Sequence, residues 1–156
     1  MNHSESELAP DMKLEHQLCF AIYACSREMT RLYRPLLEGL GITYTQYVTL
    51  LVLWEQDGLT VKELGHRLLL DSGTLTPLLK KLEKLGVIRR MRDTGDERNV
   101  RIYVTEQGKE MQLQAQDIPY QLSCRVGMEP NEARELLMQM KQVLALLHQA
   151  GDQVEK

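Results

Sequence analysis

The chain has 156 residues, a hydrophobic content of 43 % and a formal net charge of −3 at pH 7. Its length and apolar content suffice for a buried core, which excludes disorder of the whole chain. Aromatic residues make up only 5 % and leucine dominates the apolar set, a mixture that favours packed helices over a β-sandwich. No apolar run approaches the roughly 20 residues of a membrane span, and the first residues lack a signal pattern, so we expect a cytosolic protein.

The three cysteines are Cys19, Cys25 and Cys124, an odd number without Cys-x-x-Cys spacing. This pattern argues against both a secreted disulfide framework and a zinc site. The histidines also lack metal-ligand spacing, so we expect neither a metal nor a cofactor. Any disulfide in this chain is expected to be regulatory rather than structural.

The N-terminal part predicts two helices after a short tail. Residues 1–10 are polar and acidic and are predicted to form a loose tail. Helical periodicity then predicts a helix of about 25 residues that starts near Asp11 and stops at Pro35 and the glycines after it. A second helix with one apolar stripe is predicted over about 45–56.

The middle of the chain predicts two short helices joined by a tight turn. Thr60 is followed three positions later by a glutamate, the spacing of a capping box, which predicts a helix over 61–68. Asp71 or Ser72 can cap the next helix, whose leucines fall on one face, and Gly86 closes it.

Two β-like runs follow, over 87–92 and 100–104, and the polar connection around Gly95 suits the tip of a hairpin. The segment 60–104 contains ten Lys or Arg and six Asp or Glu, a net charge of +4, so the remainder of the chain carries −7. Positive charge is therefore concentrated in the helix-turn-helix and hairpin, as nucleic-acid binding requires.

The C-terminal part predicts two more helices. Thr105 is predicted to cap a helix that runs to about Ile118, and a last amphipathic helix is predicted over about 130–148. Cys124 falls in the predicted break between them. The expected fold class is therefore mostly α, with a small β-hairpin wing.

This arrangement can place the second short helix in a major groove and the hairpin along the neighbouring backbone. The outward residues of that helix are hydroxyls that can reach base edges and lysines that can contact phosphates. They are Ser72, Thr74, Thr76, Lys80 and Lys81. This helix alone supports a second interpretation equally well, in which the hydroxyls cap the helix and the lysines form an ordinary solvated face. In the hairpin, Arg98 either enters a minor groove, oriented by Asp96, or forms a surface pair with Asp96, the commoner arrangement.

The order of elements, with Asp96-Glu97-Arg98 in the hairpin and 104–108 (Val-Thr-Glu-Gln-Gly) after it, resembles the MarR family of winged-helix repressors. The resemblance covers nearly the whole chain. It implies a homodimer that binds double-stranded, pseudo-palindromic operator DNA and is not an enzyme. It also implies that the helices in 11–43 and 105–156 form the dimer, and that 44–104 is the winged helix-turn-helix DNA-binding domain.

A narrower resemblance rests on four segments. They are Gln17-Leu18-Cys19-Phe20-Ala21 with Tyr23, Tyr33-Arg34-Pro35-Leu36-Leu37, Tyr44-Thr45-Gln46-Tyr47, and the run Leu70-Asp71-Ser72-Gly73-Thr74-Leu75-Thr76-Pro77-Leu78-Leu79-Lys80. These segments resemble the organic-hydroperoxide-responsive OhrR branch of MarR. The resemblance implies that Cys19 is oxidised by an organic hydroperoxide, that Tyr23, Tyr33 and Tyr44 form its sensor pocket, and that DNA is then released. It further implies that Cys124 of the other subunit resolves the sulfenic acid as an intersubunit disulfide.

Helix geometry constrains this sensor. Tyr23 shares a helix face with Cys19, whereas Tyr33 is 14 residues away, about 21 Å along a continuous helix. If Tyr33 serves this thiol, it comes from the partner subunit. Cys25 faces elsewhere on the helix, and we interpret it as a buried small apolar residue.

Other interpretations remain open from the residues. Without the resemblance, the commoner interpretation of Cys19 is an inert buried cysteine. A second function class is a MarR-type regulator gated by a small apolar or phenolic ligand, with Cys19 incidental. A third is a thiol peroxidase, but that class lacks a Cys-x-x-Cys electron-donor motif here and leaves the wing without a role.

Overall fold

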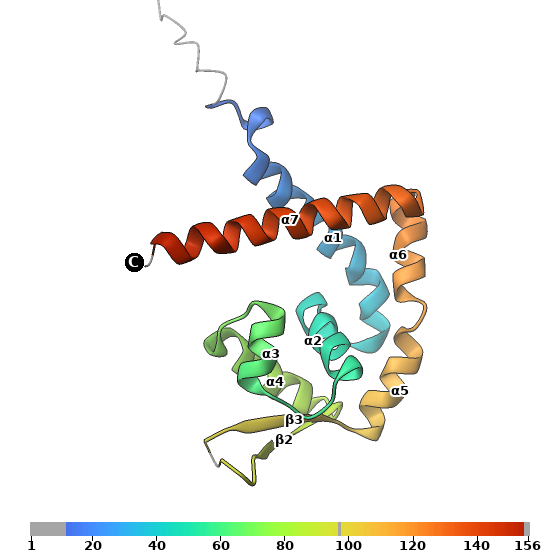
Figure 1. Ribbon diagram of the computed structural model, residues 1–156. Coiled ribbons are helices and arrows are strands. Elements are labelled where there is room, and N and C mark those ends of the chain that lie inside the picture. The colour runs from blue at the N-terminus through green and yellow to red at the C-terminus, as the bar shows by residue number, and fades with distance from the viewer. Residues whose placement is uncertain (1–11, 97, 155–156) are drawn as a thin grey trace, which may run out of the picture. The chain divides into compact units, whose positions relative to one another are not determined.

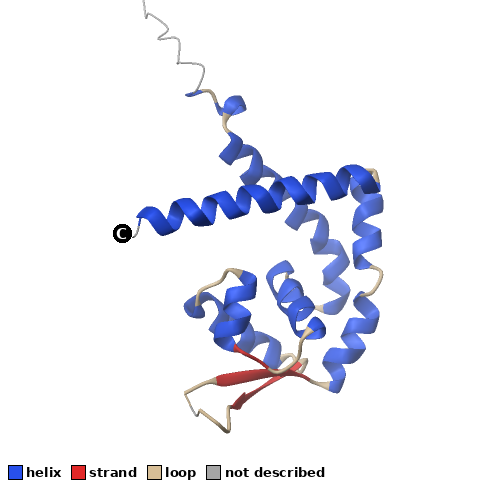
Figure 2. Ribbon diagram, in the orientation of Figure 1, coloured by secondary structure: helices blue, strands red, loops and turns tan. Residues whose placement is uncertain are grey.

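The computed structural model describes residues 12–96 and 98–154, in which helices dominate and the strands are short (Figure 2). The chain divides into two compact units, Met1–Ile118 and Pro119–Lys156. In chain order (Figure 1) the elements are η2 (Leu14–His16), α1 (Leu18–Leu37), η3 (Glu38–Leu40), α2 (Tyr44–Glu55), β1 (Leu59–Thr60), α3 (Val61–Leu68), α4 (Ser72–Lys84), β2 (Ile88–Arg92), β3 (Val100–Val104), α5 (Glu106–Ala115), α6 (Ile118–Val126) and α7 (Pro130–Val154).

The first helix is shorter than predicted. The 3-10 turn η2 is separated from α1 by Gln17, whose extended backbone (φ −89°, ψ 108°) cannot continue a helical hydrogen-bond pattern. The predicted cap Asp11 and the predicted tail 1–10 lie outside the described residues. As a result Cys19 is the second residue of α1, at the very start of the helix.

Reciprocal capping boxes fix the starts of α2 and α3. Thr43 Oγ1 accepts a hydrogen bond from Gln46 N, and Thr43 N donates to Gln46 Oε1 at 2.8 Å, so α2 begins slightly earlier than predicted. The capping box predicted at Thr60 is confirmed, because Glu63 N donates to Thr60 Oγ1 at 3.2 Å and Thr60 N donates to Glu63 Oε2 at 2.8 Å. The bounds of α3 are those predicted.

The recognition-helix candidate α4 is capped by Asp71, whose Oδ1 accepts from Thr74 N at 2.8 Å. It is followed by the predicted hairpin of β2 and β3. The structure adds the two-residue strand β1, giving an antiparallel sheet in the order β1-β3-β2. A two-residue strand has no detectable sequence period, which is why the sequence did not predict it.

The core of the first unit lies between these helices and the sheet. Its fully buried side chains include leucines of α2, α3 and α4 and one isoleucine from each of β2 and β3: Leu50, Leu53, Leu64, Leu75, Leu79, Leu82, Ile88 and Ile102. Each such burial contributes about 1.5–3 kcal/mol relative to an exposed side chain. Helix α5 packs closely here, since a Cβ on Gly108 would collide with the Val87 carbonyl oxygen, and Trp54 Nε1 donates to Gly108 O at 3.1 Å.

The C-terminal prediction is wrong in one respect that concerns the thiols. Helix α5 ends at Ala115, and Cys124 lies inside α6, not in a helix break. Pro119 does not end a helix here: it is the second residue of α6, where the missing N–H has no intrahelical partner to lose. The break lies instead around Gly127, which has φ 67°, and α7 extends beyond the predicted end at 148.

Apolar side chains remain exposed on the terminal helices. On α7 they include Leu136, Leu137, Met138, Leu144, Leu146 and Leu147, and on α1 they include Leu18, Phe20, Tyr23 and Met29. Among the described residues no single helix is long and apolar enough to cross a membrane; the bent pair Leu18–Leu40 with Tyr44–Glu55 passes that test by length and composition only.

Candidate nucleic-acid interface and thiol site

A groove of about 1480 Å³ lies between α3, the start of α4 and the wing, which we define as β2, β3 and their connection. Of the predicted DNA-binding residues, four line it: Ser72, Thr76, Asp96 and Arg98. The hydroxyl of Thr74 instead donates to Asp71 Oδ2 at 2.8 Å, so this side chain is engaged at the helix cap. Lys80 and Lys81 are exposed on α4 but do not line the groove.

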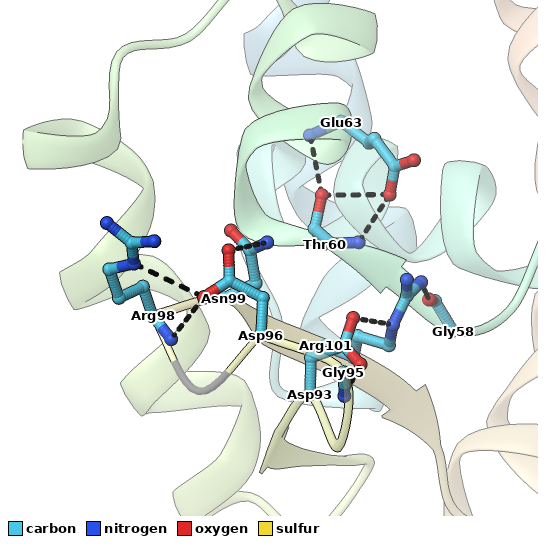
Figure 3. A network of polar contacts seen from close by, with 9 residues as sticks. All are labelled: Gly58, Thr60, Glu63, Asp93, Gly95, Asp96, Arg98, Asn99 and Arg101. Carbon is cyan, nitrogen blue, oxygen red and sulfur yellow. Dashed lines mark hydrogen bonds and ion pairs between the residues drawn. The ribbon is translucent and has the colours of Figure 1, made fainter.

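The Asp96 carboxylate accepts hydrogen bonds from two residues that follow it in the wing (Figure 3). Its Oδ1 accepts from Arg98 N at 3.1 Å and from Arg98 Nε at 3.3 Å, and its Oδ2 accepts from Asn99 Nδ2 at 3.4 Å. The surface pair is therefore present in the free chain. The Arg98 side chain is nevertheless 93 % exposed, so an ion pair of this kind contributes little stability and leaves the guanidinium accessible to a ligand.

Arg101 ties the base of the wing to the residue just before β1 (Figure 3). Arg101 Nε donates to Asp93 Oδ2 at 2.6 Å, and Arg101 Nη1 donates to Gly58 O at 2.9 Å. Asp93 Oδ1 also accepts from Gly95 N at 3.0 Å. The hydrogen bonds from Gly95 and Arg101 hold the pKa of Asp93 below its usual range, so this carboxylate stays ionised.

A second tie joins α4 to β2. Arg90 N donates to Glu83 Oε1 at 3.0 Å and Arg90 Nε donates to Glu83 Oε2 at 2.8 Å, in a pair whose side chains are only about one third exposed. These hydrogen bonds lower the pKa of Glu83. Sequence reasoning missed both this tie and the Arg101 tie, because opposite charges separated by seven or eight residues carry no distinctive pattern.

At the start of α1, Cys19 is exposed, and the structure gives it no hydrogen-bond partner among the described residues. Tyr23, one turn along, is 56 % exposed. Its hydroxyl accepts from Arg27 Nη1 at 3.4 Å, and the Arg27 guanidinium lies 5.6 Å from the centre of its ring. The free chain therefore presents Cys19 and Tyr23 on an open face.

Tyr33 and Tyr44 come together elsewhere, at the junction of α1 and α2. Their ring centroids are 4.7 Å apart, and Tyr47 lies 5.7 Å from Tyr33. Burial, followed by the neighbouring phenols of Tyr44 and Tyr47, raises the pKa of Tyr33 to about 12. Because Cys19 and Tyr33 both belong to α1, they are separated by about 21 Å along the helix axis. One chain therefore brings Tyr23, but not the Tyr33–Tyr44 pair, near Cys19.

The other two cysteines are also exposed. Cys25 was expected to be buried, and this expectation is wrong for the single chain, because none of the described residues covers the Cys25 side chain. Cys124 is exposed on α6, where a hydrogen bond with it raises the pKa of Tyr120, one helical turn away. Across the described residues, no group of three or more His, Cys, Asp or Glu side chains is placed to hold a metal ion.

Sequence relatives identify the family to which this fold and groove belong. The model of the transcriptional regulator SarA/Rot family matches residues 31–114. The chain is 49 % identical over 138 residues to the organic hydroperoxide resistance transcriptional regulator of Bacillus subtilis (strain 168), covering 88 % of this chain and 94 % of the relative. The chain belongs to the OhrR branch of the MarR family. It is thus a DNA-binding transcriptional repressor and not an enzyme, as the sequence predicted.

Two solved structures extend this similarity to the three-dimensional level. They are reduced AbfR bound to DNA, with a TM-score of 0.74 and coverage of 88 % of this chain and 95 % of that one, and overoxidized AbfR bound to DNA, with a TM-score of 0.72 and coverage of 88 % and 96 %. Both are 36 % identical to this OhrR-type chain, and AbfR is a protein of Staphylococcus epidermidis. The winged helix-turn-helix fold predicted from the sequence is confirmed.

Proposed function

We propose that this protein is a homodimeric repressor that holds operator DNA while Cys19 is reduced and releases it when an organic hydroperoxide oxidises Cys19. The observation that carries the proposal is the separation within one chain of an exposed thiol at the start of α1 from the Tyr33–Tyr44 pair at its far end. A second copy related by a two-fold axis can supply its tyrosines to the first copy's thiol, and the reverse. The hydroperoxide regulator of Bacillus subtilis, at 49 % identity, supports the choice of effector.

The chemistry needs a thiolate and a proton donor. The Cys19 thiolate attacks the peroxide, the O–O bond breaks, the alkoxide leaves as an alcohol after taking a proton, and Cys19 becomes a sulfenic acid. A tyrosine whose pKa is raised to about 12, as for Tyr33, remains a neutral phenol, so it can donate a hydrogen bond to the thiolate in its partner. Cys19, Tyr23, Tyr33 and Tyr44 are the residues assigned to this sensor pocket.

The second step uses Cys124 of the other subunit. Its sulfur attacks the sulfenic sulfur of Cys19, a disulfide forms, and the hydroxyl leaves as water with the thiol's proton. The reaction consumes one hydroperoxide and gives one alcohol, one water and one disulfide. AbfR is known bound to DNA both reduced and overoxidized. This pair of structures supports a mechanism in which the disulfide, rather than oxidation of the sulfur alone, removes the protein from DNA.

The disulfide acts on DNA through the winged helix-turn-helix. Two symmetric links draw α6 of each copy toward the start of α1 of the other, which changes the spacing or tilt of the two recognition helices. The Arg90–Glu83 tie holds each wing to its recognition helix, and Arg101 holds the wing to the Gly58 carbonyl just before β1. A displacement of α6 therefore moves α4 and the wing together and leaves their internal structure unchanged. A two-fold operator requires a fixed spacing of the two recognition helices, which this movement alters.

A gel-shift titration of an operator duplex with the reduced protein, before and after cumene hydroperoxide, tests this proposal. The wild-type protein should release DNA and run as a disulfide-linked dimer on a non-reducing gel. Cys19→Ser should keep its DNA, and Cys124→Ser should be oxidised at Cys19, as shown by mass spectrometry, yet remain bound. Cys25→Ser, which alters an exposed cysteine of the same helix, is the matched control and should behave as wild type.

Two results would overturn the proposal. Continued DNA binding by fully oxidised wild-type protein removes the switch. Release of DNA from Cys19→Ser by a small phenolic ligand, with no response of the wild type to peroxide, would establish the ligand-gated alternative instead.

A further inference from the structure

The groove between α3, α4 and the wing contains three carboxylates, and each is held by its own neighbours. Glu63 accepts from Thr60 in the capping box, Asp71 accepts from Thr74, and Asp96 accepts from Arg98. These acidic groups therefore serve caps and a turn. Their negative charge is already partly compensated by donors within the chain.

Two basic residues in the same groove have no such engagement. Lys62 and His66 both line the groove, both are exposed, and they lie four residues apart on α3, hence on one face of the helix. Within the part of the chain that the structure describes, no hydrogen bond or ion pair is found for either side chain. Arg101 differs, because Asp93 and the Gly58 carbonyl occupy its guanidinium.

The geometry of duplex DNA indicates which ligand Lys62 and His66 can contact. If α4 enters a major groove and Arg98 enters the adjacent minor groove, a sugar-phosphate strand separates the two grooves and must pass between α4 and the wing. The wall of the protein groove along that path is α3, which carries Lys62 and His66. We propose that Lys62 and His66 bind the phosphates of this strand, His66 as the imidazolium, so that DNA binding takes up protons. This inference rests on the DNA-binding part of the proposed function and is independent of its redox part.

Besides His66, the residues that line the groove include three acidic and three Lys or Arg side chains. The charged groups that line it beside His66 come from α3, the α4 cap and the wing: Lys62, Glu63, Asp71, Asp96, Arg98 and Arg101. A phosphate adds negative charge, which favours the protonated form of a nearby imidazole. Histidine is the side chain whose charge ordinarily changes between pH 5 and 8, so affinity for DNA should rise as the pH falls through that range.

The experiment measures DNA affinity of the reduced protein against salt and pH, on a short duplex selected from a random-sequence pool by the wild-type protein. Lys62→Gln should reduce the slope of log affinity against log salt by about 0.9 for each bound subunit. Lys109→Gln is the matched control, because Lys109 is an exposed lysine on α5 that pairs with Glu106 outside the groove, and it should leave the slope unchanged.

His66→Gln should bind like wild type at pH 8 and more weakly at pH 6, with a loss of up to about one proton taken up per bound subunit. His148→Gln, a histidine on α7 that does not line the groove, should keep the wild-type pH profile. Circular dichroism melting confirms that the variants fold, since both substituted side chains are exposed.

Equal salt slopes for Lys62→Gln and wild type, or parallel pH profiles for His66→Gln and wild type, would overturn the inference. Failure of the wild-type protein to select any duplex would overturn DNA binding itself. Loss of only the peroxide response would contradict the redox proposal and leave this inference intact.

Discussion

A single copy of this chain buries the apolar side chains of the winged region but leaves apolar faces of the terminal helices exposed. In the winged region, α2 to β3, leucines of three helices are fully buried against the sheet, and the Arg90–Glu83 pair holds the wing to α4. In α7, Leu137 is 53 % exposed and Leu147 is 59 % exposed, although the helix spans 25 residues. A helix with an apolar face of this extent is not stable in water by itself and needs a partner surface.

This difference separates the two tasks of the protein. DNA reading needs side chains held in fixed geometry, which a closed core provides within one copy. Peroxide sensing, as proposed, needs a thiol of one copy beside tyrosines of another, and that thiol, Cys19, lies on a surface that the single chain leaves open. The exposure of all three cysteines belongs to this second region.

The largest expected effect comes from removing a core leucine. Leu79→Ala truncates a side chain that is 1 % exposed in α4 and should lower the free energy of unfolding by about 2–5 kcal/mol, through lost burial and the cavity left behind. Leu137→Ala on α7 makes the same chemical change at a surface that only a partner would cover. Urea unfolding followed by the fluorescence of Trp54, the only tryptophan, measures both.

Protein concentration distinguishes the two variants. The loss for Leu79→Ala should be the same at low and high protein concentration, whereas the loss for Leu137→Ala should grow on dilution, because it weakens subunit association. A concentration-independent loss for Leu137→Ala of the size seen for Leu79→Ala would mean that α7 packs within its own chain and would remove the contrast between the regions.

Sequence patterns predicted the winged region better than the ends, for a physical reason. The capping box at Thr60, the cap at Asp71 and the alternation in the hairpin are local signals, and the elements formed there with nearly the predicted bounds. At the ends, the extended backbone at Gln17 and the helical start at Pro119 had no comparably clear local signal. Periodicity alone also does not show whether an apolar face is covered by the same chain or by another.

The candidate site shows the same limit. Ser72, Thr76 and Arg98 were predicted from residue type and position, and they line the groove. Lys62 and His66 were missed because a lysine and a histidine on a short amphipathic helix look like an ordinary solvated face. Only the placement of α3 opposite the wing brings them into the groove.

A change in unfolding free energy of intermediate size tests the capping box predicted from the sequence. Thr60→Ala removes the side-chain half of the capping box and leaves Glu63 N without its acceptor, so unfolding free energy should fall by about 1 kcal/mol at pH 7. Thr94→Ala, at an exposed wing position, is the control and should change it little. If both variants lose the same amount, the capping box does not stabilise the start of α3.

The loss of stability at acidic pH gives a second measurement of the capping box at the start of α3. Hydrogen bonds from the Thr60 backbone and hydroxyl lower the pKa of Glu63 in the folded protein. A carboxyl group with a lowered folded pKa contributes stability above its unfolded pKa, and this contribution is lost as pH falls through the folded pKa. Stability of the wild type should therefore drop more steeply below pH 4.5 than that of Glu63→Gln, in urea titrations at a series of pH values.

The smallest expected effect concerns strain in the helix-turn-helix itself. Leu69, between α3 and α4, has φ 55°, the only positive φ at a non-glycine among the described residues, and it is 54 % exposed. Relief of about 1–2 kcal/mol of left-handed strain exceeds the backbone entropy cost of glycine, about 0.5–1 kcal/mol. Leu69→Gly should therefore raise the unfolding free energy by about 0.5 kcal/mol.

Gly41→Ala provides the inverse control, because Gly41 has φ 67° with no atom within 4 Å of an added Cβ, so it isolates strain and should destabilise by about 1 kcal/mol. Leu69 lines the groove. If Leu69→Gly gains stability but loses affinity for DNA, the exposed leucine contacts the duplex, and the strain at the turn is retained for binding. If stability falls instead, Leu69 is packed more tightly than its exposure indicates, and the winged region is less locally determined than its capping boxes imply.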